Sequence, residues 1–94
     1  MPNAVPAMLW PDEQSFTRFR EVCTDRIAPD HQTYVLDIHA KLARRGISEE
    51  SIWKLAFDPD ELHKWCLLAG CQVDAEGRAR YAAFLADRHH RRTG

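Results

Sequence analysis

The amino-acid sequence predicts an all-α fold, a compact bundle of four to five short helices behind an extended N-terminal arm that contains proline. Apolar residues recur at three- and four-residue spacing in several segments, which is the pattern of a helix with one buried side. Residues that start and stop helices bracket these segments, and no stretch of strand length alternates between apolar and polar residues. We therefore expect an arm over residues 1–9 and a single helical domain over residues 10–94.

The first helix is expected to begin after Trp10, because Pro11, Asp12 and Glu13 suit the first turn of a helix. We expect it to end near Ala28, which precedes a proline. Its buried side is expected to carry Phe16, Phe19, Cys23 and Ile27.

Asp30 is a suitable N-cap for a second helix over residues 31–45, and Gly46 suits its C-terminal end. Ser48 is expected to cap a short third helix. The apolar residues of that third helix are Ile52, Trp53, Leu55 and Ala56.

The fourth helix is the most completely specified. Asp58 is its N-cap, Pro59 occupies its first position, and Gly70 can adopt the left-handed conformation that ends a helix. The apolar side is expected to carry Leu62, Trp65, Cys66 and Ala69. Because Leu67 and Leu68 widen this apolar surface, we expect the C-terminal half of the helix to be buried nearly all round.

Asp74 is expected to cap the fifth helix, in which Gly77 costs about 1 kcal/mol relative to alanine and is expected to loosen the first turn. Tyr81, Phe84 and Leu85 form its expected inner side.

Composition narrows the class of protein. The chain has 94 residues, 45% of them hydrophobic and 29% charged, which fits one ordered domain. A formal net charge of −1 argues against a strongly basic nucleic-acid-binding protein, but not against one with a local basic patch. The sequence shows neither a secretory signal nor a membrane-spanning run, and its three cysteines lack a CxxC pair, so we expect a cytoplasmic protein without membrane contact.

The third and fourth helices have the outline of a helix-turn-helix, a DNA-binding motif, but their charges oppose that function. Residues 49–61 hold five carboxylates and a single cation, Lys54. The helix that would read DNA begins with Asp58, Asp60 and Glu61, and these would repel phosphate. We expect this pair of helices to pack within the protein instead.

Basic residues are concentrated at the end of the second helix and along the fifth, and at the C-terminal end of a helix the dipole favours cations. They provide the alternative function, a nucleic-acid-binding regulator. Its candidate residues are Arg44, Arg45, Arg78, Arg80, Arg88, Arg91 and Arg92.

His63, Cys66 and Cys71 suggest a minor alternative, a thiol redox or metal sensor. If Gly70 closes a Schellman motif, Cys66 and Cys71 occupy the two positions that this motif brings together. Their spacing matches no established zinc signature, and buried cysteine is common as a small apolar residue. We therefore expect an inert core role and assign no metal site and no cofactor.

The sequence contains none of the nucleophile, phosphate-loop or metalloprotease motifs, so we expect no enzymatic activity. The favoured function is binding to another protein, as a regulator or inhibitor of a larger complex, and a homo-oligomer is also open. Tryptophan is enriched at interfaces, and the arm next to Trp10 either covers the bundle or docks on a partner. The candidate protein-binding residues are Trp10, Trp53, Asp60, Glu61 and Lys64.

Overall fold

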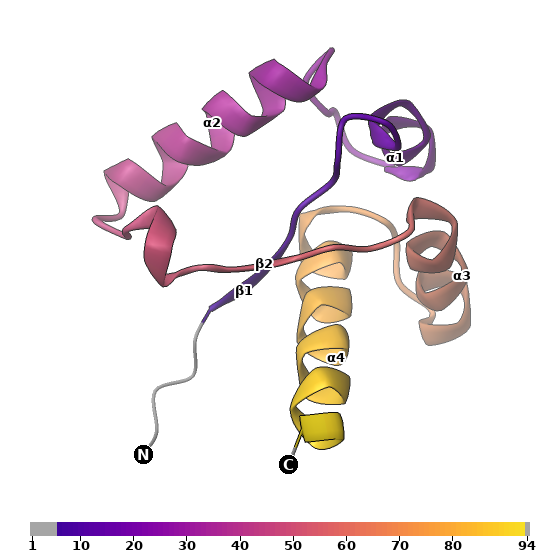
Figure 1. The fold of residues 1–94 in the computed structure, drawn as a ribbon. Coiled ribbons are helices and arrows are strands. Elements are labelled where there is room, and N and C mark those ends of the chain that lie inside the picture. Colours follow the sequence, from indigo (N-terminus) through magenta and orange to yellow (C-terminus); the bar gives the residue numbers. More distant parts are fainter. Residues whose placement is uncertain (1–5, 94) are drawn as a thin grey trace.

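A computed structural model describes the backbone of residues 6–93 and the side chains of residues 6–89 (Figure 1). In chain order the elements are β1 (Ala7–Leu9), α1 (Phe16–Val22), α2 (His31–Arg44), the 3₁₀ turn η1 (Glu49–Ser51), β2 (Trp53–Leu55), α3 (Pro59–Ala69) and α4 (Ala75–Thr93). The molecule is mostly helical, with four α-helices and a two-stranded parallel sheet in the part described. The prediction of a largely helical domain is confirmed, and the prediction of a purely all-α fold is wrong.

The two strands replace part of the predicted arm and most of the predicted third helix. Ser48 does act as a cap, accepting from the N–H of Glu50, but only one 3₁₀ turn follows. The chain then extends, and the N–H of Trp53 donates to the carbonyl of Pro6 at 2.8 Å. At the other end the N–H of Trp10 donates to the carbonyl of Leu55 at 2.9 Å. Strands of three residues are too short to show the alternation that predicts a strand.

The strand pair belongs to the core. Leu9 and Leu55 are 5% and 2% exposed, and α4 packs against both strands. Residues 7–9 are therefore an integral part of the domain, whereas residues 1–5 of the predicted arm lie outside the described residues.

Helix α1 is shorter than predicted at both ends. Before it, the Asp12 carboxylate accepts from the N–H of Ser15 at 2.7 Å and holds a turn. After Val22 the backbone becomes extended, and the N–H of Thr24 donates to the carbonyl of Val73 at 2.9 Å. This bond to a distant segment replaces the next helical hydrogen bond, so the helix ends.

The predicted ends of α2 and α3 are confirmed. Asp30 accepts from the N–H of Thr33 at 2.8 Å, and Asp58 accepts from the N–H of Asp60 at 2.9 Å. Gly70 has a φ of 75° and closes a Schellman motif. In that motif the N–H of Cys71 donates to the carbonyl of Cys66 at 3.0 Å.

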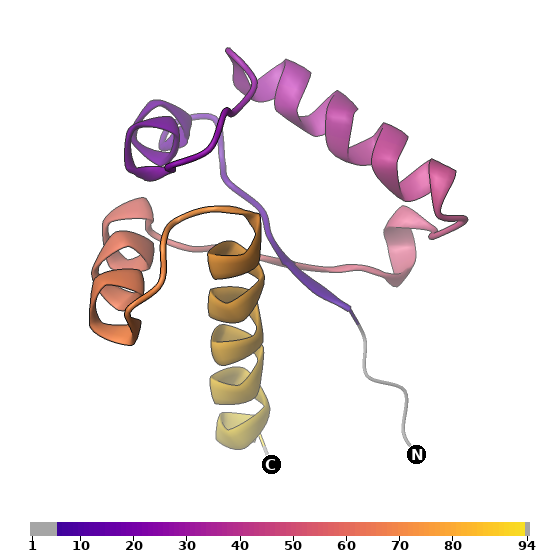
Figure 2. The same cartoon turned by 180° about the vertical axis from the view of Figure 1, so that it is seen from behind.

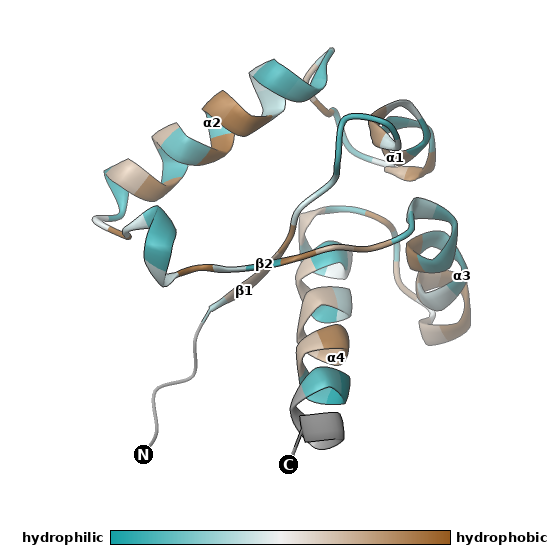
Figure 3. Cartoon of the chain, viewed as in Figure 1, coloured by the Kyte–Doolittle hydropathy of each residue, from teal (hydrophilic) through white to brown (hydrophobic). Residues whose placement is uncertain are grey.

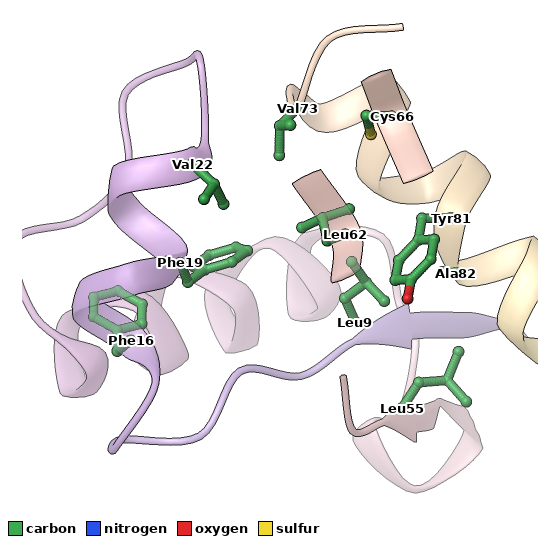
Figure 4. Packing of buried hydrophobic residues seen from close by; sticks show 10 residues of the cluster. All are labelled: Leu9, Phe16, Phe19, Val22, Leu55, Leu62, Cys66, Val73, Tyr81 and Ala82. Atoms are coloured by element: carbon green, nitrogen blue, oxygen red, sulfur yellow. The ribbon is translucent and has the colours of Figure 1, made fainter. Parts of the chain in front are cut away.

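The core lies where α1, α3, α4 and the strands meet (Figure 4). Phe19 of α1 and Leu62 of α3 are fully buried at its centre. Helices α1 and α3 contact each other, and Figure 2 shows them one above the other from behind. The buried cluster consists of Leu9, Phe16, Phe19, Val22, Leu55, Leu62, Cys66, Val73, Tyr81 and Ala82.

Gly77 allows the start of α4 to lie against the preceding loop. Asp74 accepts from the N–H of Gly77 at 2.9 Å, which caps the helix as predicted. A Cβ atom on Gly77 would stand 1.9 Å from the carbonyl oxygen of Gln72. The glycine that looked like a weak point is thus required by a close backbone contact.

Gly77→Ala should lower the free energy of unfolding by about 2 kcal/mol, because the loop or the helix must move to admit the methyl group. Urea denaturation measures this change. Gly46→Ala is the matched control, since Gly46 has a φ of 68° but no atom within 4 Å of a Cβ, and it should cost about 1 kcal/mol. A Gly77→Ala protein stabilised by about 1 kcal/mol, as helix propensity alone predicts, would contradict the contact.

Candidate protein-binding site

Three aromatic rings meet between α3 and α4. The centroid of Trp65 lies 5.5 Å from that of Tyr81 and 5.5 Å from that of Phe84, and the last two are 6.0 Å apart. Trp65 lies on the side of α3 that faces α4, beside the buried stripe of Leu62 and Cys66. The rings hold one another in place, and Tyr81 joins them to the core.

The C-terminal half of α3 is exposed, so the expectation that it is buried nearly all round is wrong. Leu68 is 83% exposed and Leu67 is 68% exposed. Figure 3 shows hydrophobic residues along these turns of α3. Leu68 follows Trp65 by three residues, which places it on the Trp65 side of the helix. Phe84 is also 38% exposed, and the apolar surface therefore continues onto α4.

Two arginines of α4 lie over these rings. The guanidinium carbon of Arg80 is 5.9 Å from the centroid of Trp65, and that of Arg88 is 5.6 Å from the centroid of Phe84. Both contacts are cation–π interactions. We call the surface made by Trp65, Leu68, Arg80, Phe84 and Arg88, with the buried Tyr81 beneath it, the α3–α4 face. Burial raises the pKa of the Tyr81 hydroxyl.

The other tryptophans named from the sequence lie elsewhere. Trp10 is half-buried, and its ring stacks on that of His39 with the two centroids 6.2 Å apart. The Nζ atom of Lys54 lies 4.4 Å from the centroid of the Trp10 ring. Its ring is therefore engaged within the protein. Trp53 is 37% exposed and meets His89 of α4 edge-on at 5.7 Å.

The charged candidates of α3 form exposed ion pairs near its N-terminal end. Asp60 accepts from Nε of Arg18 in α1 at 2.6 Å. Oε2 of Glu61 lies 3.8 Å from Nζ of Lys64, which follows three residues later. Such exposed pairs add little to stability, and these side chains are accessible to a partner.

The structure does not gather the candidate nucleic-acid-binding arginines into one patch. Arg44 and Arg45 are exposed at the C-terminal end of α2, which Figure 1 shows well apart from α4. Arg80 and Arg88 belong to the α3–α4 face. Arg91 and Arg92 are in the last turns of α4, and their side chains lie outside the described residues.

Arg78 is engaged inside the protein. Its guanidinium donates to both carboxylate oxygens of Asp25, at 2.7 and 3.0 Å. It also donates to the carbonyl of Val73 at 3.3 Å and to Sγ of Cys23 at 3.5 Å. The pair ties the loop after α1 to α4. Sequence reasoning missed Asp25 because nothing in its local spacing connects it with α4.

The His63, Cys66 and Cys71 group supports an inert role. Cys66 is 1% exposed, and burial raises the pKa of its thiol to about 12, with the hydrogen bond to the Cys71 thiol adding to the shift. A thiol with so high a pKa is a poor nucleophile at neutral pH. His63, Cys66 and Cys71 line a cavity of about 170 Å³, yet no cluster of three ligands suited to a metal occurs among the described residues.

These observations define a mostly helical domain with a small parallel sheet and an exposed aromatic and arginine-bearing surface. By sequence the chain belongs to the family described as "Domain of unknown function (DUF8829)", whose model matches residues 2–92. Neither a curated protein nor a solved structure matches it. Of the described helices, none has the combination of length and apolar character needed to cross a membrane.

Asp25→Asn should lower the free energy of unfolding by about 1–2 kcal/mol at pH 7, a value reduced for the partial exposure of Asp25. The hydrogen bonds from Arg78 hold the pKa of the Asp25 carboxyl below its ordinary 3.8. The stabilisation from the Asp25–Arg78 pair is therefore present above pH 3.8, and it is lost as the pH falls through the lowered pKa of Asp25 in the folded protein. Urea denaturation across this range measures it, with Asp37→Asn as the exposed control. A pH-independent difference would contradict the ion pair.

Iodoacetamide at neutral pH should alkylate Cys71 well before Cys66, because Cys66 is buried and its thiol pKa is about 12. Peptide mass spectrometry over a time course measures both rates. In guanidinium the two rates should become equal, which serves as the control. Equal rates in the folded protein would show that Cys66 is accessible and would reopen its role as a reactive thiol.

Proposed function

We propose that this protein is a small non-enzymatic module of the cytoplasm that binds another protein, as a regulator or inhibitor of a larger complex. The observation that carries the proposal is the exposure of Leu68 and Phe84 beside Trp65. Neither Leu68 nor Phe84 belongs to the described core cluster, whereas Tyr81 does and Trp65 packs against it. Packing within the chain therefore does not account for the two exposed side chains. Contiguous exposed apolar side chains of this kind mark interaction sites.

The composition of the α3–α4 face supports a protein partner. Tryptophan, tyrosine and arginine are the residue types that dominate binding energy at protein interfaces. Trp65 is held by ring contacts with the buried Tyr81 and with Phe84 before any partner arrives, so less conformational freedom is lost on binding. Arg80 and Arg88 stand beside the apolar centre and would meet carboxylates of the partner.

One acidic candidate, Glu61, fits the margin of the same surface, whereas Asp60 is paired with Arg18 of α1. Glu61 precedes Trp65 by four residues and therefore lies on the same side of α3. Beside the effect of burial, the charge of Glu61 raises the pKa of the Tyr81 hydroxyl and that of Arg88 lowers it, so both charges lie near this ring. A partner would thus meet a mixed polar rim around an apolar centre, which is the usual organisation of an interface.

A nucleic-acid-binding regulator is the second candidate. It is favoured by Arg80 and Arg88 over aromatic rings, an arrangement that also suits stacking of single-stranded bases. It is weakened by Arg78, whose charge is compensated by Asp25, and by the separate location of Arg44 and Arg45. The thiol or metal sensor is weaker still, given the buried Cys66.

A photo-crosslinking amino acid at position 68 should capture a specific protein from a lysate of the native host. The same group at Leu36, which is 60% exposed on α2, is the matched control and should not capture it. Adding Phe84→Ala should reduce capture about tenfold or more, because it removes a central apolar anchor without emptying the core. Quantitative mass spectrometry of the crosslinked bands measures the effect.

Two results would overturn this proposal. One is that the same proteins are crosslinked from position 68 and from position 36, or that Phe84→Ala leaves the crosslinking from position 68 unchanged. The other is binding to single-stranded oligonucleotides with a log–log salt slope of several units that Phe84→Ala weakens, which would favour the nucleic-acid function.

A further inference from the structure

Strand β1 has an unpaired edge. The carbonyl of Pro6 and the N–H of Trp10 both point to β2. Because successive residues of a strand direct these groups to opposite sides, the N–H and C=O groups of Ala7 and Leu9 point away from β2. The described sheet has two strands only, so no third strand lies on that side.

A groove runs along this edge between α2 and α4. Its volume is about 230 Å³, and β1 contributes all three of its residues to the lining. On the α4 side the lining is mostly alanine, and these small side chains leave room for another backbone beside β1. The residues contributed by the helices are Tyr34, Ile38, Lys41, Ala75, Arg78, Ala79 and Ala82. We call this feature the β1 groove.

The charge of the β1 groove selects its occupant. Lys41 and Arg78 are the charged residues of its described lining, and both are cationic. Arg78 is hydrogen-bonded to Asp25, and the charge of the exposed Lys41 also acts on the Asp25 carboxylate. Two cations therefore stand against one carboxylate, and the described lining stays net positive. By four-residue spacing along α2, Arg45 and Asp37 lie on the same side of the helix as Lys41, and neither lines the groove.

We propose that the β1 groove binds an extended acidic segment of a partner protein, which adds to β1 as a third strand. Main-chain hydrogen bonds to Ala7 and Leu9 would supply affinity, and carboxylates facing Lys41 would supply preference. A second copy of this chain is a poorer occupant, because its own β1, Ala7–Leu9, has no carboxylate and carries the same cations beside it.

The site is separate from the α3–α4 face. Ala79 and Ala82 line the β1 groove, whereas Arg80 and Phe84 belong to the other side of α4. The inference therefore goes beyond the proposed function, and each can fail without the other.

The test uses the full ¹⁵N-labelled chain and a capped synthetic peptide of alternating valine and glutamate. Saturating peptide should slow amide hydrogen exchange at Ala7 and Leu9 about tenfold or more, because their N–H groups become bonded. The amide of Met8 is an internal control, since alternation already directs it to β2. The corresponding valine–lysine peptide should bind more weakly, and Lys41→Glu should weaken the glutamate peptide about fivefold.

Substitutions at Ala7 separate hydrogen bonding from bulk. Ala7→Pro removes the edge-facing N–H, leaves the bonds to β2 in place, and should reduce affinity about tenfold. Ala7→Val adds similar bulk, keeps the N–H, and should bind within about twofold of the wild type. Thermal unfolding of each variant checks that the fold is kept.

Four results of the peptide experiments would overturn the proposal. They are no binding of the glutamate peptide, binding without slowed exchange at Ala7 and Leu9, equal binding of the lysine peptide, and unchanged affinity of the folded Ala7→Pro protein. A fifth result would also overturn it. If exchange at Ala7 and Leu9 slows with rising protein concentration in the absence of peptide, the occupant is a second copy of this chain.

Discussion

The parallel pairing of β1 with β2 is the interaction on which the rest of the structure depends. Backbone hydrogen bonds at both ends bring the N-terminal segment against the middle of the chain. The register places Leu9 beside Leu55, and α4 covers both in the core (Figure 4). The same pairing leaves the opposite edge of β1 open and thereby creates the β1 groove. Core and groove are consequences of one contact between distant segments.

The side chains of helix α4 meet a different environment on each of three sides of the helix. Its buried side carries Tyr81 and Ala82, its alanine side leaves space beside β1, and its third side presents Phe84 and two arginines. Arg78 lies between the groove and the core, where Asp25 compensates it. In a domain with so small a core, this helix is needed for folding and also contributes to both proposed binding surfaces.

Local signals predicted the helices well and the strands not at all. The N-caps Asp30, Asp58 and Asp74 and the C-terminal Gly70 were read correctly, because capping bonds join residues a few positions apart. Helix α1 was predicted too long, since the bond from Thr24 to Val73 that ends it is not local. The candidate site followed the same division. Arg88 follows Phe84 by four residues in α4, a spacing that places the two side chains together. The contact of Arg80 with Trp65 joins two helices and was not predictable from spacing.

By itself the sequence determined the order of the four α-helices and most of their ends, because these depend on residue type within one or two turns; the third of the five helices it predicted is mostly a strand. Only the tertiary structure decided that residues 7–9 form a strand and that Leu68 is exposed beside the aromatic cluster. It also decided that Arg78 is engaged by Asp25. Each of these outcomes depends on a partner far away in the chain, and such partners are chosen by the packing of the whole domain.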